Sequence, residues 1–456
     1  MFLPNKIINK IFEHWVWLLA GLAFLLLALN IFIFYPGVMS LDSINQLRQA
    51  LGKANYYDQH PPIMAFIWSI GIAITGKVSS MLVLQLSLLW ASLLILSIYA
   101  YKVSNSKLIS IVPLVFGTLP FVVNISATIW KDVQMAFSIL LGASLILVSI
   151  KSKGKQKRIL LGIAALSFVY ALTLRYNAIF AVLPLVYLAG IQLTDNRKLI
   201  IAGCSVLLVA AVVINTILSA ALKVEKTNPQ FTFMLDDVVN SLSPADIQDS
   251  QVSDEMKDSL ITIQGACKER GKVIHSYLFC SNPEQRQLVR YEGYPELKSL
   301  WFNMLTSKPF NYLKYRIKTF SIFMFTPRGY DYIHQRGIEK NELGQKSKNP
   351  KLARAVNNYV ARFAHRDFGV LFRPYFWLLL SVATLVYSLK RMKSYRLFVQ
   401  CLSISSILYI VTYFPVVIAG DYRYVYWSVL ATPLALLLIM LDKRIKPTKR
   451  RKALKN

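Results

Sequence analysis

Long apolar stretches, separated by short charged connections, dominate the hydrophobic pattern of this chain. Ten of them have about the length that a helix needs to cross the hydrocarbon of a bilayer. They cover residues 15–35, 80–101, 108–124, 133–150, 159–174, 178–194, 198–222, 371–389, 397–419 and 424–441. Their apolar positions are continuous rather than alternating, and a backbone in lipid must satisfy its own hydrogen bonds. The pattern therefore predicts an all-α polytopic membrane protein.

The basic residues indicate on which side of the membrane each connection lies. Lys102 and Lys107 flank one connection, and residues 151–158 hold five basic residues and no acid. Residues 390–396 hold four basic residues, and the tail after Leu441 holds eight with one acid. Short loops rich in Lys and Arg face the cytoplasm. We therefore expect all of these connections to be cytoplasmic.

An eleventh apolar stretch, residues 61–76, decides the topology. If it crossed the membrane fully, the basic connections would fall on opposite sides. We therefore expect it to be interfacial or re-entrant, which gives about ten spans with both termini in the cytoplasm. The outer face then receives the loop 36–79, the polar segment 223–370, and the short junctions at Asp132, Asn177 and Asp421.

The polar segment divides the chain into three expected parts. These are a transmembrane module over 1–222, an extracytoplasmic domain of α or α+β structure over 223–370, and C-terminal spans with a basic tail over 371–456. Cys267 and Cys280 lie in the polar segment and would form a disulfide if it is outside the cytoplasm; two unpaired thiols are the alternative. The net charge of +29 does not indicate nucleic-acid binding, because the basic clusters lie between apolar stretches.

Acidic residues are rare outside the polar segment. The chain has 23 Asp and Glu, of which 16 fall within 225–367. Among the other seven, Asp42, Asp58, Asp132 and Asp421 lie at the ends of apolar stretches, and the topology above puts all four at the outer face. A carboxylate at the membrane edge is costly and is therefore a functional candidate.

The first outer loop holds the candidate general base. Asp42 follows the first span closely, and a partly desolvated carboxylate there can accept a proton from a hydroxyl group. Capping of the helix that begins near Ser43 is the alternative role. The loop ends with His60 and a Pro-Pro pair, and His60 either holds the loop or contacts substrate. No pair of His residues with ligand spacing occurs in these loops, so no metal site is predicted.

Three cations lie at the same expected face. Lys131 can bind a phosphate, extend towards water or pair with its neighbour Asp132. Arg175 joins two spans almost without a polar linker and offers a fork for a phosphate, with an interfacial role beside Tyr176 as the alternative. Arg423 opens the last span. Together they predict a site for a lipid-linked phosphate, whose substrate-contacting or loop-organising neighbours would be Asp58, His60, Asp132, Tyr176, Asn177, Asp421 and Tyr424.

This arrangement resembles the GT-C membrane glycosyltransferases that use polyprenyl-phosphate sugars, in the branch of protein O-mannosyltransferases and aminoarabinose transferases. In that branch an acid follows the first span, an HPP or KPP tripeptide ends the same loop, an Asp opens a later span and an Arg-Tyr pair often opens a late one. The matches here are Asp42, His60-Pro61-Pro62, Asp132 and Arg423-Tyr424. They cover residues 10–195 well and the C-terminal spans loosely.

The chain also departs from the family pattern. Ser43 stands where the mannosyltransferases carry the second acid of an Asp-Glu pair, which puts any role of that acid in doubt. The Trp-Lys-Asp triplet is not the usual surrounding of the later Asp, and residues 223–370 have no match. These departures favour a bacterial relative with a divergent substrate.

The resemblance implies an enzyme of the bacterial cytoplasmic membrane, surrounded by membrane lipids, whose active site faces outward. It would move a sugar from a polyprenyl-phosphate donor to an envelope acceptor, which is a glycan, a lipid or a protein. Asp42 would act as the base, and Lys131, Arg175 and Arg423 would stabilise the departing phosphate. No cofactor is required, although a divalent metal ion at the phosphate is compatible with the mechanism. Three alternatives stay open: a transporter or flippase of a lipid-linked or anionic substrate, a surface polysaccharide polymerase or ligase, and a non-enzymatic envelope scaffold.

Overall fold

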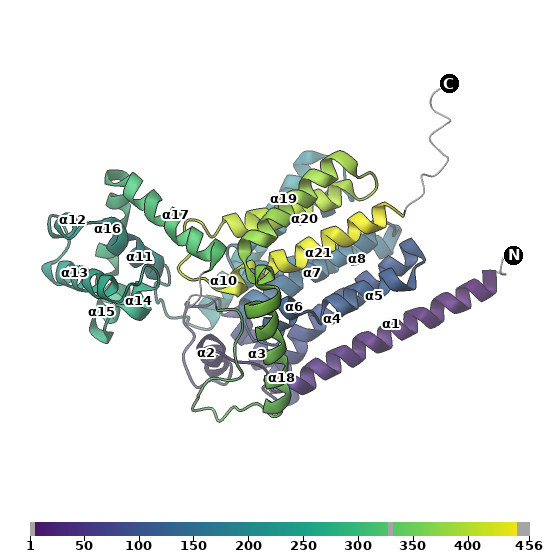
Figure 1. Ribbon diagram of the computed structural model, residues 1–456, viewed down its shortest axis with the longest axis horizontal. Helices are drawn as coiled ribbons and strands as arrows, with labels where there is room; N and C mark the ends of the chain where they lie inside the picture. The colour runs from purple at the N-terminus through teal and green to yellow at the C-terminus, as the bar shows by residue number, and fades with distance from the viewer. Residues whose placement is uncertain (1–4, 327–331, 445–456) are drawn as a thin grey trace, which may run out of the picture.

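The computed structural model describes residues 5–326 and 332–444 of the chain. Within these residues the structure is helical. Four isolated β-bridges occur among the described residues, and none of them extends into a strand. Figure 1 shows a bundle of long helices and, at one end of it, a module of short helices. The first residues of α1 and the last residues of α21 lie at the other end of the bundle (Figure 1). The predicted class, an all-α polytopic membrane protein, is confirmed.

Every stretch that was predicted to span the membrane contains a helix, although the helix in 397–419 ends at Val411. Six helices have the length and apolar content to cross a bilayer: α1 (Asn5–Phe34), α4 (Ser80–Ser104), α7 (Lys131–Ser149), α8 (Gly154–Leu174), α10 (Arg197–Ala221) and α21 (Tyr426–Asp442), which the short helix η4 (Tyr422–Val425) precedes. Three further helices are shorter or less apolar: α9 (Ala178–Gly190), α19 (Pro374–Arg391) and α20 (Arg396–Val411). They belong to the bundle through packing, since α20 contacts α9, α19 and α21.

The predicted span 108–124 is broken in the middle. It forms α5 (Lys107–Phe116) and α6 (Pro120–Ser126), which meet at 45°. Pro120 occupies the first turn of α6, where its missing N–H is tolerated. At Gly117 a Cβ atom would come within 2.6 Å of the side chain of Leu93, so the chain needs a glycine to make this bend against α4.

The loop after α1 carries two short helices, α2 (Leu41–Ala50) and α3 (Ile63–Thr75). With 13 residues, α3 is about 20 Å long at 1.5 Å per residue, too short for a hydrocarbon core of about 30 Å. Before α2, Val38 forms a β-bridge with Thr128, and Met39 forms one with Ile338. The start of α2 is therefore fixed against the start of α7 and against the segment that follows α17.

The module at the end of the bundle has a hydrophobic core of its own, built from residues between Phe231 and Met304. We call it the polar module. Its helices are α11 (Phe231–Ser241), α12 (Pro244–Gln248), α13 (Asp254–Glu269), α14 (Ser276–Phe279), α15 (Pro283–Gln287), η1 (Leu288–Glu292) and α16 (Tyr294–Ser307). Cys267 at the end of α13 forms a disulfide with Cys280, which directly follows α14.

The remainder of segment 223–370 packs on the bundle, although residues 309–325 also contact the polar module. The helix α17 (Pro309–Phe325) returns the chain to the bundle, where Phe323 is fully buried. The helix α18 (Pro350–Arg362) packs against α1 and α6. The short helices η2 (Phe363–Asp367) and η3 (Gly369–Phe372) then lead into α19. The residues that form the separate core of the polar module thus cover only part of the polar segment 223–370.

Candidate active site

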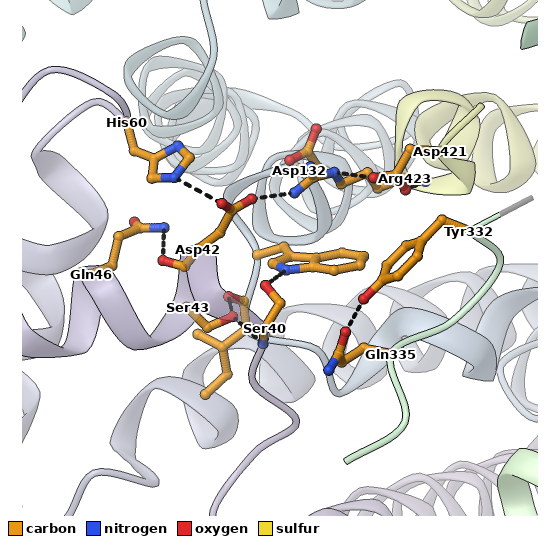
Figure 2. Close-up of polar contacts among 12 residues, drawn as sticks. Ser40, Asp42, Ser43, Gln46, His60, Asp132, Tyr332, Gln335, Asp421 and Arg423 are labelled. Atoms are coloured by element: carbon orange, nitrogen blue, oxygen red, sulfur yellow. Dashed lines mark hydrogen bonds and ion pairs between the residues drawn. The ribbon is translucent and has the colours of Figure 1, made fainter. Parts of the chain in front are cut away.

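Asp42 lies at the centre of a polar cluster at the end of the bundle that carries the polar module. It is the second residue of α2, and Figure 2 shows its carboxylate between His60 and Arg423. Nη1 of Arg423 donates to Oδ2 over 2.7 Å, and Nε2 of His60 lies 3.5 Å from Oδ1. Asp42 makes no side-chain cap to α2, because Ser40 is the N-cap residue. Its side chain therefore faces the cluster and not its own helix.

The environment keeps Asp42 ionised. Burial opposes the charged form, but the charges and hydrogen bonds of His60 and Arg423 outweigh it and hold the pKa of Asp42 well below its usual range. Burial and the charge of Lys131 lower the pKa of His60, so at neutral pH its imidazole is uncharged. Arg423 is then the cation that contacts Asp42 at neutral pH.

Arg423 contacts a second carboxylate as well. Its Nε lies 2.7 Å from Oδ2 of Asp421, and its guanidinium group stacks 4.8 Å from the centre of the Trp130 ring. Burial raises the pKa of Asp421 to about 6, although Arg423 opposes this. Two carboxylates on one guanidinium group thus have pKa values that move in opposite directions, an arrangement typical of acid and base pairs in active sites.

A second ion pair lies deeper in the bundle. Arg175, directly after α8, binds Oδ1 of Asp132 in the first turn of α7 and donates through Nε to Asn177 over 3.1 Å. Asp132 is fully buried, and its other oxygen has no partner among the described residues. The Tyr424 ring lies 5.5 Å from the guanidinium carbon of Arg175 and 5.4 Å from that of Arg423. One aromatic ring therefore connects the two ion pairs.

Lys131 is the cation of the cluster that has no partner of its own. It opens α7 between Trp130 and Asp132, and it lies within electrostatic reach of Arg175, Asp42 and Arg423. Within residues 5–326 and 332–444, its ammonium group makes no ion pair or hydrogen bond. A partly buried cation without a counter-ion is suited to bind an anionic ligand.

A cavity of about 390 Å³ opens directly beside this cluster. Ser40, Leu41, Asp42, Trp130 and Arg423 form its wall on the bundle side, together with Ala419, Gly420 and Asp421. Tyr332 and Glu339 form a second wall, and Figure 2 shows Tyr332 beside the cluster. The cavity has the size of a small-molecule site, and it combines a carboxylate, a cation and aromatic surface.

The polar module closes the cavity from the other side. Ile274, His275, Leu278 and Phe279 line it. His275 has a left-handed backbone with φ of 61°, which is uncommon for a residue with a side chain. The buried carboxylate of Asp236 holds it there by accepting from the backbone N–H groups of His275 and Ser276 over 2.9 and 2.7 Å. Backbone strain of this kind concentrates at functional sites.

The other predicted site residues lie around this cluster and make different contacts. Oδ1 of Asp58 accepts from both the backbone N–H and the hydroxyl group of Thr227 over 2.6 Å, so Asp58 ties the first loop to the start of the polar module. Asn177 orients Arg175. Tyr176 points away from the cluster and is 77% exposed. The structure thus brings together Asp42, His60, Lys131, Asp132, Arg175, Asp421, Arg423 and Tyr424.

Several residues of the cavity carry no signal in the sequence. Tyr332, Glu339 and His275 lie in the polar segment, among many residues of the same types. The hydrogen bond that the backbone N–H of His275 donates to Asp236 joins residues 39 positions apart and depends on the tertiary fold. A residue pattern along the chain does not reveal such contacts.

The described residues do not provide a metal centre. Within residues 5–326 and 332–444, no three side chains of His, Cys, Asp or Glu form a group that could hold a metal ion. A metal that bridged a phosphate and Asp42 would have to compete with Arg423 and His60 for the carboxylate. We therefore assign no metal ligands.

No protein-family model and no curated protein matches the chain. Among solved structures, the chain is similar to the crystal structure of ArnT from Cupriavidus metallidurans in the apo state. The sequence identity is 11% and the TM-score is 0.34, with the match covering 95% of this chain and 77% of that chain. A similarity at this level assigns neither an activity nor a substrate to the protein.

Proposed function

We propose that the protein is a membrane glycosyltransferase of the GT-C type, which moves a sugar from a polyprenyl-phosphate donor to a hydroxyl group of an envelope acceptor. One observation supports the proposal most strongly: an ionised carboxylate, Asp42, and the cation Arg423 line one cavity at an end of the bundle, and Lys131 lies within electrostatic reach of both. The reaction needs a base for the acceptor and positive charge for the departing phosphate. We place this end at the outer face, because the α4–α5 and α19–α20 connections, which are basic, lie at the other end (Figure 1).

The donor phosphate would enter between the cations. Lys131 has no counter-ion among the described residues, and Arg423 divides its donors between Asp42 and Asp421. A phosphate that attracts Arg423 weakens its contact with Asp42, so the basicity of Asp42 rises when the donor is bound. The low basicity of Asp42 in the free protein is therefore compatible with its role as the base.

The transfer step is a single displacement at the anomeric carbon. The acceptor oxygen forms a bond to this carbon and gives its proton to Asp42. The bond from the same carbon to the phosphate oxygen breaks, and the electron pair leaves with the lipid phosphate. Lys131, Arg175 and Arg423 meet the charge that develops on this phosphate, in a site that is already organised.

The lipid chain of the donor has a suitable groove beside Arg175. A cavity of about 410 Å³ runs along α8, α9 and α10, and it is lined mainly by apolar side chains. Tyr176 lies at this groove, directly next to Arg175. An isoprenoid chain in the groove would bring its phosphate close to Arg175.

The proposal is tested with the full-length protein in lipid nanodiscs. Radiolabelled polyprenyl-phosphate sugars and an extract of envelope glycolipids serve as donor and acceptor. We expect label to move to the acceptor in a time-dependent reaction that requires Asp42. If the protein binds none of the donors, or binds one and moves it across the bilayer of a vesicle without chemical change, it is not a glycosyltransferase.

A further inference from the structure

The extended segment 332–339 separates two cavities. Tyr332 and Glu339 line the cavity beside Asp42. His334, Arg336 and Gly337 line a second cavity of about 450 Å³ on the side of α18. The backbone of this segment is held by Met39, whose N–H donates to Gly337 and whose carbonyl accepts from Glu339. The second cavity is therefore a separate site behind the wall of the first.

The second cavity is cationic. Its polar lining consists of His334, Arg336, Ser347, Arg354, Asn357 and Asn358. Neither Arg336 nor Arg354 has an ion pair or a hydrogen bond in the part of the chain that the structure describes. Residues 343–361 add three lysines and no acid. Unpaired guanidinium groups beside amide side chains are suited to bind a phosphate.

The ring of His334 is an independent indication of a binding site. The residue is only 8% exposed, and neither nitrogen of its ring has a partner among the described residues. Buried polar atoms are almost always hydrogen-bonded, so these two require a ligand or a solvent molecule. Burial and the charges of Arg336 and His365 lower the pKa of His334 to about 4. The neutral ring can donate one hydrogen bond to an anion.

The N-terminus of α18 opens into the same cavity. Pro350 begins this helix of 13 residues and lines the cavity, and no side chain caps the first turn. The preceding residues are fixed at the end of α1, because Asn349 donates to the carbonyl of Phe32 and the N–H of Lys348 donates to Tyr35. The uncapped N–H groups add to the attraction for an anion.

An apolar groove continues from this point along the membrane-spanning part of α1. It has a volume of about 690 Å³ and is lined by Phe24, Leu27, Ala28, Ile31 and Phe32, with Tyr35 and Val83. Lys348 and Asn349 stand at its end, directly between two residues of the cationic cavity, Ser347 and Pro350. An apolar groove in the membrane that ends at a cationic cavity matches an amphiphile with an anionic head.

We propose that these two cavities together bind an anionic membrane lipid. Its phosphate contacts Arg336, Arg354 and His334, and one of its chains lies along α1. This site is distinct from the donor site, because Lys131 and Arg175 lie with Asp132 in another part of the bundle end and line neither cavity. The proposal does not depend on the reaction that the protein catalyses.

The test is native mass spectrometry of the full-length protein with phosphatidylglycerol and phosphatidylcholine. We expect tighter binding of phosphatidylglycerol, and a loss of about tenfold or more for each arginine in Arg336→Ala and Arg354→Ala. The matched control is Lys346→Ala with Lys351→Ala, which removes the same charge from exposed positions outside both cavities. Because Arg354 is exposed, Arg354→Ala gives a folded variant if Arg336→Ala does not fold.

The groove and the headgroup are tested separately. Ala28→Trp fills the groove and should weaken phosphatidylglycerol binding, while Leu25→Trp on the exposed face of α1 should not. Equal binding of both lipids, or equal losses in the arginine and lysine variants, overturns the proposal. If inorganic phosphate displaces phosphatidylglycerol at millimolar concentration and Ala28→Trp has no effect, the cavity binds a soluble anion and the lipid assignment is wrong.

Discussion

Arg423 and Asp42 are 381 positions apart in the sequence and form an ion pair of 2.7 Å at the wall of the cavity. The pair joins the loop after α1 to the loop that precedes α21. The Asp42 side chain is 34% exposed, so a substrate in the cavity can reach it. An ion pair that is open to the cavity can change when a charged substrate binds there.

The first prediction concerns the identity of the base. Asp42→Asn keeps the shape of the side chain but removes its basicity, so we expect sugar transfer to fall by at least about a hundredfold with donor binding retained. Glu339→Gln is the matched control, because Glu339 lines the same cavity. Both are measured as initial transfer rates with saturating donor. Loss of activity in Glu339→Gln and not in Asp42→Asn would assign the base to Glu339.

The second prediction concerns pH. His60 and Arg423 hold the pKa of Asp42 well below its usual range, so wild-type protein keeps its base ionised as the pH falls towards 4. Removing Arg423, or the hydrogen bond and low-pH charge of His60, raises the pKa of Asp42, and its protonation then begins at higher pH. In His60→Gln and in Arg423→Gln, the acid limb of the profile of kcat/KM against pH should therefore move upward. An acid limb at the wild-type position in both variants would mean that another group controls it.

The third prediction separates structure from function at the buried pair Asp132–Arg175. Arg175→Gln leaves a fully buried carboxylate without its cation, which costs about 3–5 kcal/mol of folding free energy. The double variant Asp132→Asn with Arg175→Gln removes both charges and should recover most of this loss. Donor binding should stay weak in the double variant, because the phosphate has lost a cation. Thermal unfolding and donor titration of the two variants give these quantities; full recovery of donor binding would make Arg175 purely structural.

The fourth prediction concerns the wall that the polar module adds. Replacing Cys267 and Cys280 by Ser opens a loop of 13 residues and should cost about 3 kcal/mol of stability. The bond lies next to Phe279, so we expect the KM for the acceptor to rise while the affinity for the donor is unchanged. Asp236→Asn should act in the same direction, since it weakens the hold on His275. Equal effects on both substrates would indicate general unfolding.

The membrane part of the fold could be predicted from the sequence because its signal is local. Each apolar stretch by itself predicts a helix. Asp42, Asp132, Arg175 and Asp421 can be recognised as candidates because charged residues are rare near such stretches. The break at Gly117 was missed, since it depends on contact with Leu93 on another helix. Hydropathy also gave no sign that α9 and α20 would be as short as 13 and 16 residues.

The partners of these residues could not be predicted in the same way. The sequence left open whether Lys131 binds a phosphate or pairs with Asp132, and the structure pairs Asp132 with Arg175. Asp58 was predicted to contact substrate or to organise the loop, and its carboxylate accepts hydrogen bonds from Thr227. These differences arise from the angles at which helices pack and from contacts between distant loops. The sequence therefore identifies the candidate residues. It does not show which of them contact a substrate and which hold the structure together.

The cavity beside Asp42 takes one wall from the bundle and the other from residues 274–279 of the polar module. The bundle thus provides the charged residues Asp42, Asp421 and Arg423 of the cavity, and the polar module provides a mainly apolar wall. The polar module has its own hydrophobic core and its own disulfide. Substitutions at residues 274, 278 and 279 would therefore change which molecules fit the cavity and leave the charged residues of the bundle in place.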